Sequence, residues 1–300
     1  MKIMVFDVGG TEIKYSVMDE QMHRTNSGAV PTPQDTQAQF LDAVYRLYAP
    51  HKDEVSGIAM ALPGFVDNRT GYVSNGGALL YNTATPVGQL LAEKCGCPVI
   101  LENDGKAAAM AELANGALKD CCNAAVFIIG TGVGGGIIAN GQLVRGVHFT
   151  AGEYSFVNTN AEAWDAPDQN MACQCSTSNL LKWYRARKAL PEDAPLDGRS
   201  FFAAANAGEP EALEVLRRFC HAVAVQIYNL TVLLDVEKVA IGGGISAAEA
   251  LLPAIQAELD WLFERCTVMP TVKPELVRCR YGNDANLIGA LKLFFEQNPA

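Results

Sequence analysis

Basic residues are scarce in this chain. Lys and Arg together number 23 against 33 Asp and Glu, which leaves a formal net charge of −10 over 300 residues. A protein that coats nucleic acid or an anionic membrane needs a basic face. The composition therefore argues against both of these partners, although a local basic pocket for a small phosphate stays compatible with it.

Long apolar segments and a regular cysteine framework are also lacking. Only four apolar residues separate Lys2 from Asp7, too few for the core of a signal peptide. The longest apolar run, 124–139, is interrupted by glycines and one threonine, so we expect no membrane-spanning helix. Nine cysteines, an odd number without regular spacing, predict reduced thiols and a cytoplasmic protein.

The chain is otherwise that of an ordered protein, with 49% hydrophobic and 19% charged residues. Its length predicts two domains at roughly 150 residues each. Apolar strands alternate with amphipathic helices, which favours the α/β class. We expect strands at 2–6, 13–18, 56–62, 98–101, 124–129, 136–139 and 239–241, and helices at 37–48, 85–95, 106–113, 219–234 and 286–296.

One pattern occurs twice: an apolar strand, a glycine-rich turn, then another strand. It opens the chain and returns near residue 130, so we expect two related halves with a cleft between them. The stretch 158–178 has no periodicity and is predicted to be an irregular loop.

The first glycine turn is Asp7-Val8-Gly9-Gly10-Thr11. Its backbone amides could form a concave anion site, Asp7 could hold Mg²⁺, and Thr11 and Lys14 could add a hydroxyl and a charge. A tight hairpin needs the same glycines for its geometry alone. Taken by itself, this segment favours the simple hairpin.

The second glycine turn is richer than a hairpin requires. Five of the seven residues from 130 to 136 are glycine: Gly130, Gly132, Gly134, Gly135 and Gly136. Thr131 lies among them. The segment differs from a Walker-type ATP-binding loop, because no G-K-[ST] follows the glycines. Gly242-Gly243-Gly244 follows another strand. Three such turns are best explained together by a nucleotide site.

Two carboxylates are candidates for chemistry. Asp104 lies where a strand is predicted to end and a helix to begin, and it could accept the proton of a substrate hydroxyl. Alternatively, Asp104 is an ordinary N-cap of the helix. Its neighbour Asn103 could form hydrogen bonds to a sugar or merely shape the turn. Glu153, in Ala151-Gly152-Glu153, could bind two hydroxyls or be an exposed loop residue.

A zinc site is not expected. Cys173 and Cys175 have metal-compatible spacing, but no third cysteine and no histidine follow them closely. Structural zinc usually needs four ligands.

Taken together, the segments at Asp7, Glu102-Asn103-Asp104, Gly130, Ala151-Gly152-Glu153 and Ile241 resemble the ROK family of sugar kinases and related repressors. The resemblance runs from residue 3 to about 290. It implies two actin-like (ribonuclease H-like) domains: 1–105, completed by the C-terminal helix at about 286–300, and 106–285. It further implies a homodimer that takes ATP with Mg²⁺ and a small sugar.

The resemblance also implies roles for individual residues. Asp104 is the catalytic base, and Asn103, Glu153, Gly64 and Gly77 bind the sugar. Asp7 is the Mg²⁺ residue. The ATP-binding residues are Asp7, Gly9, Gly10, Thr11, Lys14, Gly130, Thr131, Gly132, Gly134, Gly135, Gly136, Gly242, Gly243 and Gly244.

Two departures from the family pattern bear on substrate choice. Phe156 stands where zinc-containing members have a histidine. The run that begins at Cys173 has Ser176, Asn179 and Leu180 in place of their two glycines and last cysteine. This zinc-free pattern is most similar to that of bacterial β-glucoside kinases. It implies phosphorylation of the 6-hydroxyl of a hexose or β-glucoside. The alternatives are a kinase of free glucose or N-acetylmannosamine, and a non-catalytic sugar sensor. A repressor is disfavoured, because the first strand begins at Lys2.

Overall fold

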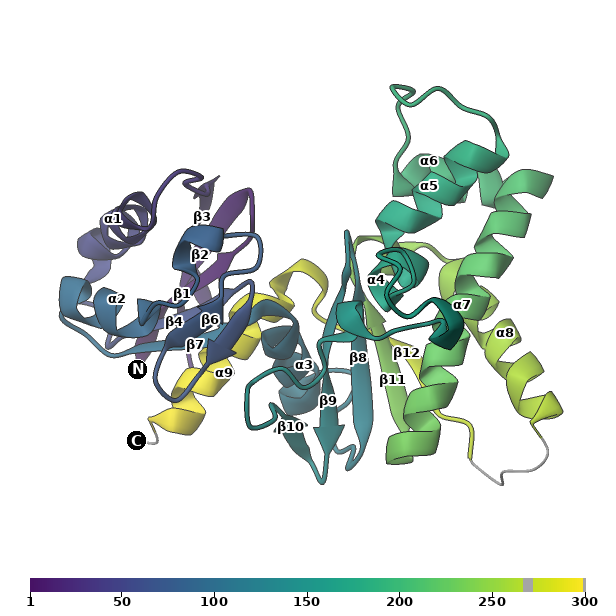
Figure 1. Cartoon of the computed structure of the whole chain (residues 1–300). Helices are drawn as coiled ribbons and strands as arrows, with labels where there is room; N and C mark the ends of the chain where they lie inside the picture. The colour runs from purple at the N-terminus through teal and green to yellow at the C-terminus, as the bar shows by residue number, and fades with distance from the viewer. Residues whose placement is uncertain (267–271, 299–300) are drawn as a thin grey trace. The chain divides into compact units, whose positions relative to one another are not determined.

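The computed structural model describes residues 1–266 and 272–298. It contains two five-stranded sheets and a small hairpin (Figure 1). The strands of the first sheet are β1 (Lys2–Val8), β2 (Glu12–Asp19), β3 (Arg24–Pro31), β4 (Ile58–Leu62) and β7 (Val99–Asn103). Those of the second are β8 (Ala124–Ile129), β9 (Val133–Ala139), β10 (Gln142–Val144), β11 (Lys238–Gly242) and β12 (Glu275–Arg278), while β5 (Phe65–Asp67) and β6 (Tyr72–Asn75) form the hairpin.

The two five-stranded sheets share one topology. Their orders are β3-β2-β1-β4-β7 and β10-β9-β8-β11-β12. In each sheet the first three strands in sequence pair antiparallel, and the next two join in parallel. The predicted α/β class with two related halves is therefore confirmed.

The chain divides into two compact units. Unit 1 contains Met1–Ala114, Arg145–Ala151 and Asn283–Ala300, and unit 2 contains Asn115–Val144 and Gly152–Gly282. The division predicted from the sequence, 1–105 with 286–300 and 106–285, stays a prediction, and residues 299–300 of it lie outside the described part of the chain.

The helices of the described residues are α1 (Gln37–Tyr48), α2 (Val87–Cys95), α3 (Asp104–Asn115), α4 (Met171–Cys175), α5 (Thr177–Arg187), α6 (Gly198–Asn206), α7 (Pro210–Leu234), α8 (Leu251–Arg265) and α9 (Ala285–Gln297).

Unit 1 is a sheet covered on both faces. Alternate side chains of β1 point to opposite faces, and Met4 and Phe6 pack with Phe40 of α1 and Leu91 of α2. Helix α9 contacts β1, β4 and β7, so both faces of these strands are buried (Figure 1). Burying a side chain such as Phe6, which is 0% exposed, contributes about 2 kcal/mol. This rigid sheet positions the residues at its strand ends.

Unit 2 has its core between the second sheet and the helices α5 to α8. Phe127 and Ile241 of the sheet pack with Phe219 and Val223 of α7 and with Ile255 of α8. Helix α7 begins with Pro210 in its first turn, where proline lacks only an amide that the helix would leave unpaired. Within residues 1–266 and 272–298, every helix is too short or too polar to cross a membrane.

The structure corrects three expectations. Strand β9 begins at Val133, so Gly134, Gly135 and Gly136 lie within a strand paired with β8 rather than in the turn. The segment 158–178 holds helix α4 and the start of α5. The sequence also failed to predict β3, since its exposed residues Arg24–Pro31 alternate too little between apolar and polar.

Candidate active site

The carboxyl end of β7 places Asn103 and Asp104 at the start of α3. Asn103 Oδ1 accepts a hydrogen bond from Lys106 N at 3.0 Å, the bond that an N-cap side chain makes. Asp104 Oδ1 accepts from Gly105 N at 2.8 Å and from Asn103 Nδ2 at 3.1 Å. Asn103, not Asp104, is therefore the capping side chain, and the N-cap alternative does not explain the aspartate.

Gly64 and Gly77 lie beside this turn. Asn103 Nδ2 donates to the carbonyl of Gly64 at 3.0 Å. Gly64 has a φ of +103°, and a Cβ there would lie 2.0 Å from Asn75 O and 2.9 Å from Gly77 N, so only glycine fits. The structure thus brings together four residues that the sequence predicted to bind sugar or to act on it: Gly64, Gly77, Asn103 and Asp104.

Asp7 lies at the same edge of the sheet, near the end of β1, which is separated from β7 by the parallel strand β4. Its side chain is largely buried, and its Oδ1 accepts from Asn286 Nδ2 at 2.9 Å while Lys14 Nζ lies 3.8 Å from Oδ2. Burial raises the pKa of Asp7, and Asn286 and Lys14 work in the opposite direction. Sequence reasoning missed Asn286, whose contact spans 279 positions and has no local signal.

In each glycine turn, one backbone amide is hydrogen-bonded within the turn itself. The amide of Gly9 donates to Glu12 O at 2.8 Å, and that of Gly130 donates to Gly132 O at 3.0 Å. Within the described part of the chain, the amides of Gly10, Thr11, Thr131 and Gly132 donate to no protein acceptor. These four amides, rather than those of Gly9 and Gly130, are the ones that could hold a phosphate.

Unit 2 contains a cavity of about 690 Å³ at its second glycine turn. Gly130, Thr131 and Gly244 line it together with residues of α5 and α6, so three residues predicted to bind ATP share one cavity. Thr177 lines it as well, and its buried Oγ1 has no hydrogen-bond partner among the residues that the structure describes. An unsatisfied buried hydroxyl at a cavity is the kind of group that a polar ligand satisfies. No sequence motif pointed to Thr177.

Glu153 immediately precedes a short 3₁₀ helix, Tyr154–Phe156, in unit 2. The next two residues hold this helix to β9: Tyr154 Oη donates to Gly136 O at 3.0 Å, and Ser155 Oγ accepts from Val133 N at 3.0 Å. Phe156, three residues after Glu153, is 71% exposed. The aromatic ring of Phe156 is therefore accessible to a ligand and is close in sequence to Glu153.

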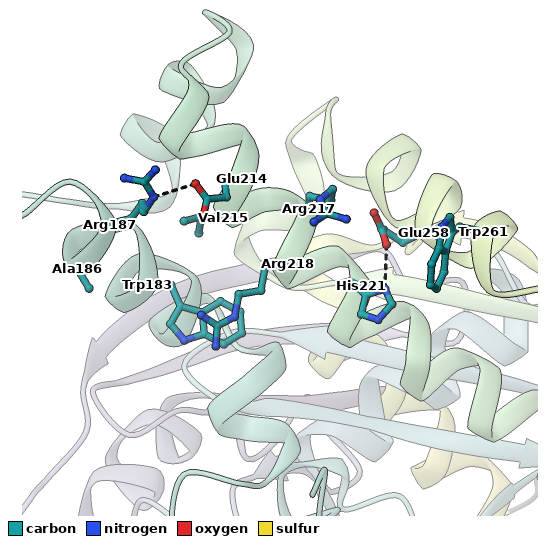
Figure 2. A pocket seen from close by; sticks show the side chains of 10 residues that line it. All are labelled: Trp183, Ala186, Arg187, Glu214, Val215, Arg217, Arg218, His221, Glu258 and Trp261. Atoms are coloured by element: carbon teal, nitrogen blue, oxygen red, sulfur yellow. Dashed lines mark hydrogen bonds and ion pairs between the residues drawn. The ribbon is translucent and has the colours of Figure 1, made fainter.

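A second cavity in unit 2, of about 700 Å³, contains none of the predicted site residues. Figure 2 shows its lining from α5, α7 and α8. The Arg218 guanidinium stacks 3.8 Å from the Trp183 ring centroid, Arg187 pairs with Glu214 at 2.8 Å, and His221 with Glu258 at 2.9 Å. Its carboxylates and imidazole already have partners, so we place the chemistry elsewhere.

Neither cysteine of the 173–175 pair is in a zinc-like cluster. Among the described residues, no three His, Cys, Asp or Glu side chains are grouped to hold a metal ion. Burial of Cys175 on α4 raises the pKa of its thiol to about 12, which disfavours the thiolate that zinc requires. The absence of zinc stays a prediction.

The fold and the site define the class of protein first: a two-domain protein with the actin-like ATPase fold. Residues 3–297 match the ROK family, and the chain belongs to it.

Similar proteins are sugar kinases and a sugar-bound relative. A beta-glucoside kinase of Klebsiella pneumoniae is 31% identical over 98% of this chain and 96% of its own. A ROK family protein of Streptococcus pneumoniae in complex with sucrose has a TM-score of 0.88 and 29% identity over 99% of both chains. A glucokinase of Streptomyces griseus in complex with glucose and AMPPNP has a TM-score of 0.81 and 25% identity over 98% of this chain and 99% of its own.

Proposed function

We propose that this protein is an ATP-dependent sugar kinase that phosphorylates the 6-hydroxyl of a hexose or β-glucoside. The observation that carries the proposal is the Asn103–Asp104 turn at the end of β7. Asn103 makes the capping bond of α3, and the Asp104 carboxylate stands at the strand end, where α/β enzymes bind their ligands.

In the proposed reaction, Asp104 accepts the proton of the sugar hydroxyl as its oxygen attacks the γ-phosphorus of ATP. Asn103, Gly64 and Gly77 orient the sugar from unit 1, and Glu153 binds further hydroxyls. The attack breaks the bond between the γ-phosphorus and its bridging oxygen, leaving ADP. Most of the catalysis then comes from positioning and from stabilising charge, as is general for phosphoryl transfer.

ATP is proposed to bind in the 690 Å³ cavity of unit 2. The amides of Thr131 and Gly132 face its phosphates, and the Thr177 hydroxyl gains a partner that it lacks within residues 1–266 and 272–298. In unit 1, the amides of Gly10 and Thr11 and the Lys14 ammonium would serve the transferred phosphate. Gly134 to Gly136 lie in β9, and we propose that they contribute to the ATP site by letting that strand pack closely. Gly242 and Gly243 are proposed to contribute by forming the turn that places Gly244 at the cavity.

The surroundings of Asp7 fit Mg²⁺. Mg²⁺ prefers oxygen ligands and is usually held by one or two carboxylates together with substrate phosphates. Asp7 offers such a carboxylate beside the first glycine turn, and Asn286 fixes its orientation. When bound, Mg²⁺ would neutralise charge on the phosphate oxygens. Lys14 and Asn286 would keep the Asp7 carboxylate oriented for it.

A β-glucoside is the preferred substrate class. The Klebsiella pneumoniae relative bears that name, and this chain has the exposed Phe156 at the end of the short helix that follows Glu153. An aromatic side chain there suits a substituent at the anomeric end of the sugar. Free glucose or N-acetylmannosamine is the alternative substrate. A homodimer is proposed from the family resemblance alone.

The test is ADP release with Mg²⁺-ATP across glucose, cellobiose, an aryl β-glucoside and N-acetylmannosamine. We expect turnover to concentrate on the two β-glucosides. Turnover confined to a free monosaccharide would keep the kinase and contradict the glucoside. Silence across the panel would favour the sensor alternative.

Replacing Phe156 tests the substrate class within one protein. We expect Phe156→Ala to lower kcat/KM for the aryl β-glucoside about fivefold, because an aromatic contact contributes roughly 1 kcal/mol, and to leave glucose nearly unaffected. Trp164→Ala is the matched control, since Trp164 is also an exposed aromatic of unit 2, 74% exposed. Equal losses on both sugars would contradict a contact with the substituent.

A further inference from the structure

The segment between β10 and Glu153 belongs to a different unit from the chain on either side of it. Residues 145–151, here the 145–151 loop, belong to unit 1, although the chain on both sides belongs to unit 2. Ala151 N donates to Arg145 O at 3.2 Å and closes the loop at its base. The loop ends two residues before Glu153, so it connects the two groups of proposed sugar-binding residues along the chain.

The loop is held in one conformation. Phe149 has a φ of +60°, which bulky residues rarely adopt, and only 9% of it is exposed. The Arg69 guanidinium lies 4.7 Å from the centroid of its ring. Backbone of this kind persists where its surroundings determine it and is common at functional sites.

Arg145 joins this loop to the residue before Asn103. Arg145 Nε donates to Glu102 Oε2 at 2.8 Å, and its Nη2 lies 3.1 Å from Met110 Sδ of α3. The Glu102 side chain is 0% exposed. Its Oε2 also accepts from Asn68 Nδ2 at 3.3 Å, and its Oε1 accepts from Asn103 N at 3.0 Å. The carboxylate thus holds the backbone of the proposed sugar ligand.

A buried carboxylate at this place has a cost. Burial raises the pKa of Glu102, and Arg145 is the largest influence in the opposite direction, with a smaller one from buried Lys106. Glu296 of α9 is the other carboxylate whose charge interacts with Arg145. Without Arg145, the buried Glu102 carboxylate loses its ion-pair partner, which destabilises the buried charge and disturbs the bond that Glu102 makes to Asn103 N.

We propose that Arg145 is a positioning residue for phosphoryl transfer. Its ion pair with Glu102 neutralises that carboxylate and holds the Asn103–Asp104 turn in its working geometry, while the 145–151 loop anchors the segment that leads to Glu153. This inference rests on the proposed function, since it assigns Arg145 to the same reaction. Arg145 is not among the residues proposed to bind the sugar, ATP or Mg²⁺.

The test compares four variants with the wild type by ADP release: Arg145→Met, Glu102→Gln, the double variant and Arg187→Met. Arg187 pairs with Glu214 at the same 2.8 Å and serves as the matched control. We expect Arg145→Met to lower kcat on the order of 10- to 100-fold, because small misplacements of reacting groups cost this much. The KM for ATP should stay within about twofold, and Arg187→Met should behave as wild type.

Rescue distinguishes positioning from a merely structural role. Adding Glu102→Gln to Arg145→Met removes the uncompensated charge, so the double variant should regain at least about fivefold in kcat. All assays are made well below the lowest Tm of the set, so that every variant is fully folded. An Arg145→Met protein with at least half the wild-type kcat, or a double variant no faster than Arg145→Met, would overturn the inference. A wild type that phosphorylates no sugar would instead contradict the proposed function.

Discussion

The two sheets share their strand order but differ in what ends their strands. In unit 1, the strands β1 and β7 end beside carboxylates, Asp7 and Asp104. In unit 2, the strands β8 and β11 run into glycines, Gly130 and Gly242–Gly244. One topology therefore presents two chemistries, because a fold positions strand ends while the side chains at those ends decide what they do.

The difference divides the proposed reaction between the units. Carboxylates suit the hydroxyl to be deprotonated and the cation that accompanies ATP, whereas bare backbone amides suit phosphate oxygens. A carboxylate at Gly130 or Gly244 would repel the phosphates, and a glycine at Asp104 would leave no base. The predictions that follow test this division, from the largest expected effect to the smallest.

Removing the base should have the largest effect. Asp104→Asn keeps the size of the side chain but takes up no proton, so we expect kcat to fall by on the order of 10³ while sugar binding persists. ADP release and calorimetric titration with the sugar measure the two quantities. Asp19→Asn, at an exposed carboxylate that bonds within its own turn, is the control. If Asp104→Asn kept most of the activity, the proposal that unit 1 supplies the general base would be wrong.

Adjacent glycines of unit 2 should respond in opposite ways. A Cβ at Gly243, whose φ is +91°, would lie 2.1 Å from Ile129 O, whereas one at Gly244 meets nothing within 4 Å. We expect Gly243→Ala to lower the free energy of unfolding by about 3 kcal/mol. Gly244→Ala should change it by less than about 0.5 kcal/mol and raise the KM for ATP instead, because Gly244 lines the cavity.

Thermal melts and ATP kinetics on the two variants separate packing from ligand contact. If Gly244→Ala left the KM for ATP unchanged, this would contradict the proposal that ATP binds in the cavity of unit 2. If Gly243→Ala were as stable as the wild type, the tight turn after β11 would not need a glycine.

Asp7→Asn should have a small effect on stability that depends on pH. Burial, the largest cause, raises the pKa of Asp7 above its ordinary 3.8. Between these two pKa values the folded protein binds more protons than the unfolded one, so Asp7 lowers stability as pH rises through that window. The variant lacks this penalty, and its Tm should exceed that of the wild type by about 2 °C at neutral pH, with the gain vanishing towards pH 4. An equal gain at both pH values would contradict the titration of Asp7.

Sequence reasoning was most accurate where a local pattern carries the information. Helix α1 has its predicted bounds, because Phe40, Val44 and Tyr48 recur at helical spacing behind a Thr36 cap. Asp7 and Asn103–Asp104 were found because apolar strands end there. Strand β3 and helix α5, with few apolar residues, gave no such signal, and α5 buries only Leu180 and Tyr184.

By itself, the sequence determined the α/β class, the repeat of strand, turn and strand, and the candidate carboxylates, because each depends on residues close together in the chain. Only the tertiary structure decided that Asn286 orients Asp7, that Thr177 lies unsatisfied beside Gly130, and that Arg145 pairs with Glu102. The two residues of each of these three pairs lie 43 to 279 positions apart in the chain. No local periodicity encodes such contacts; they arise when packed elements bring distant side chains together.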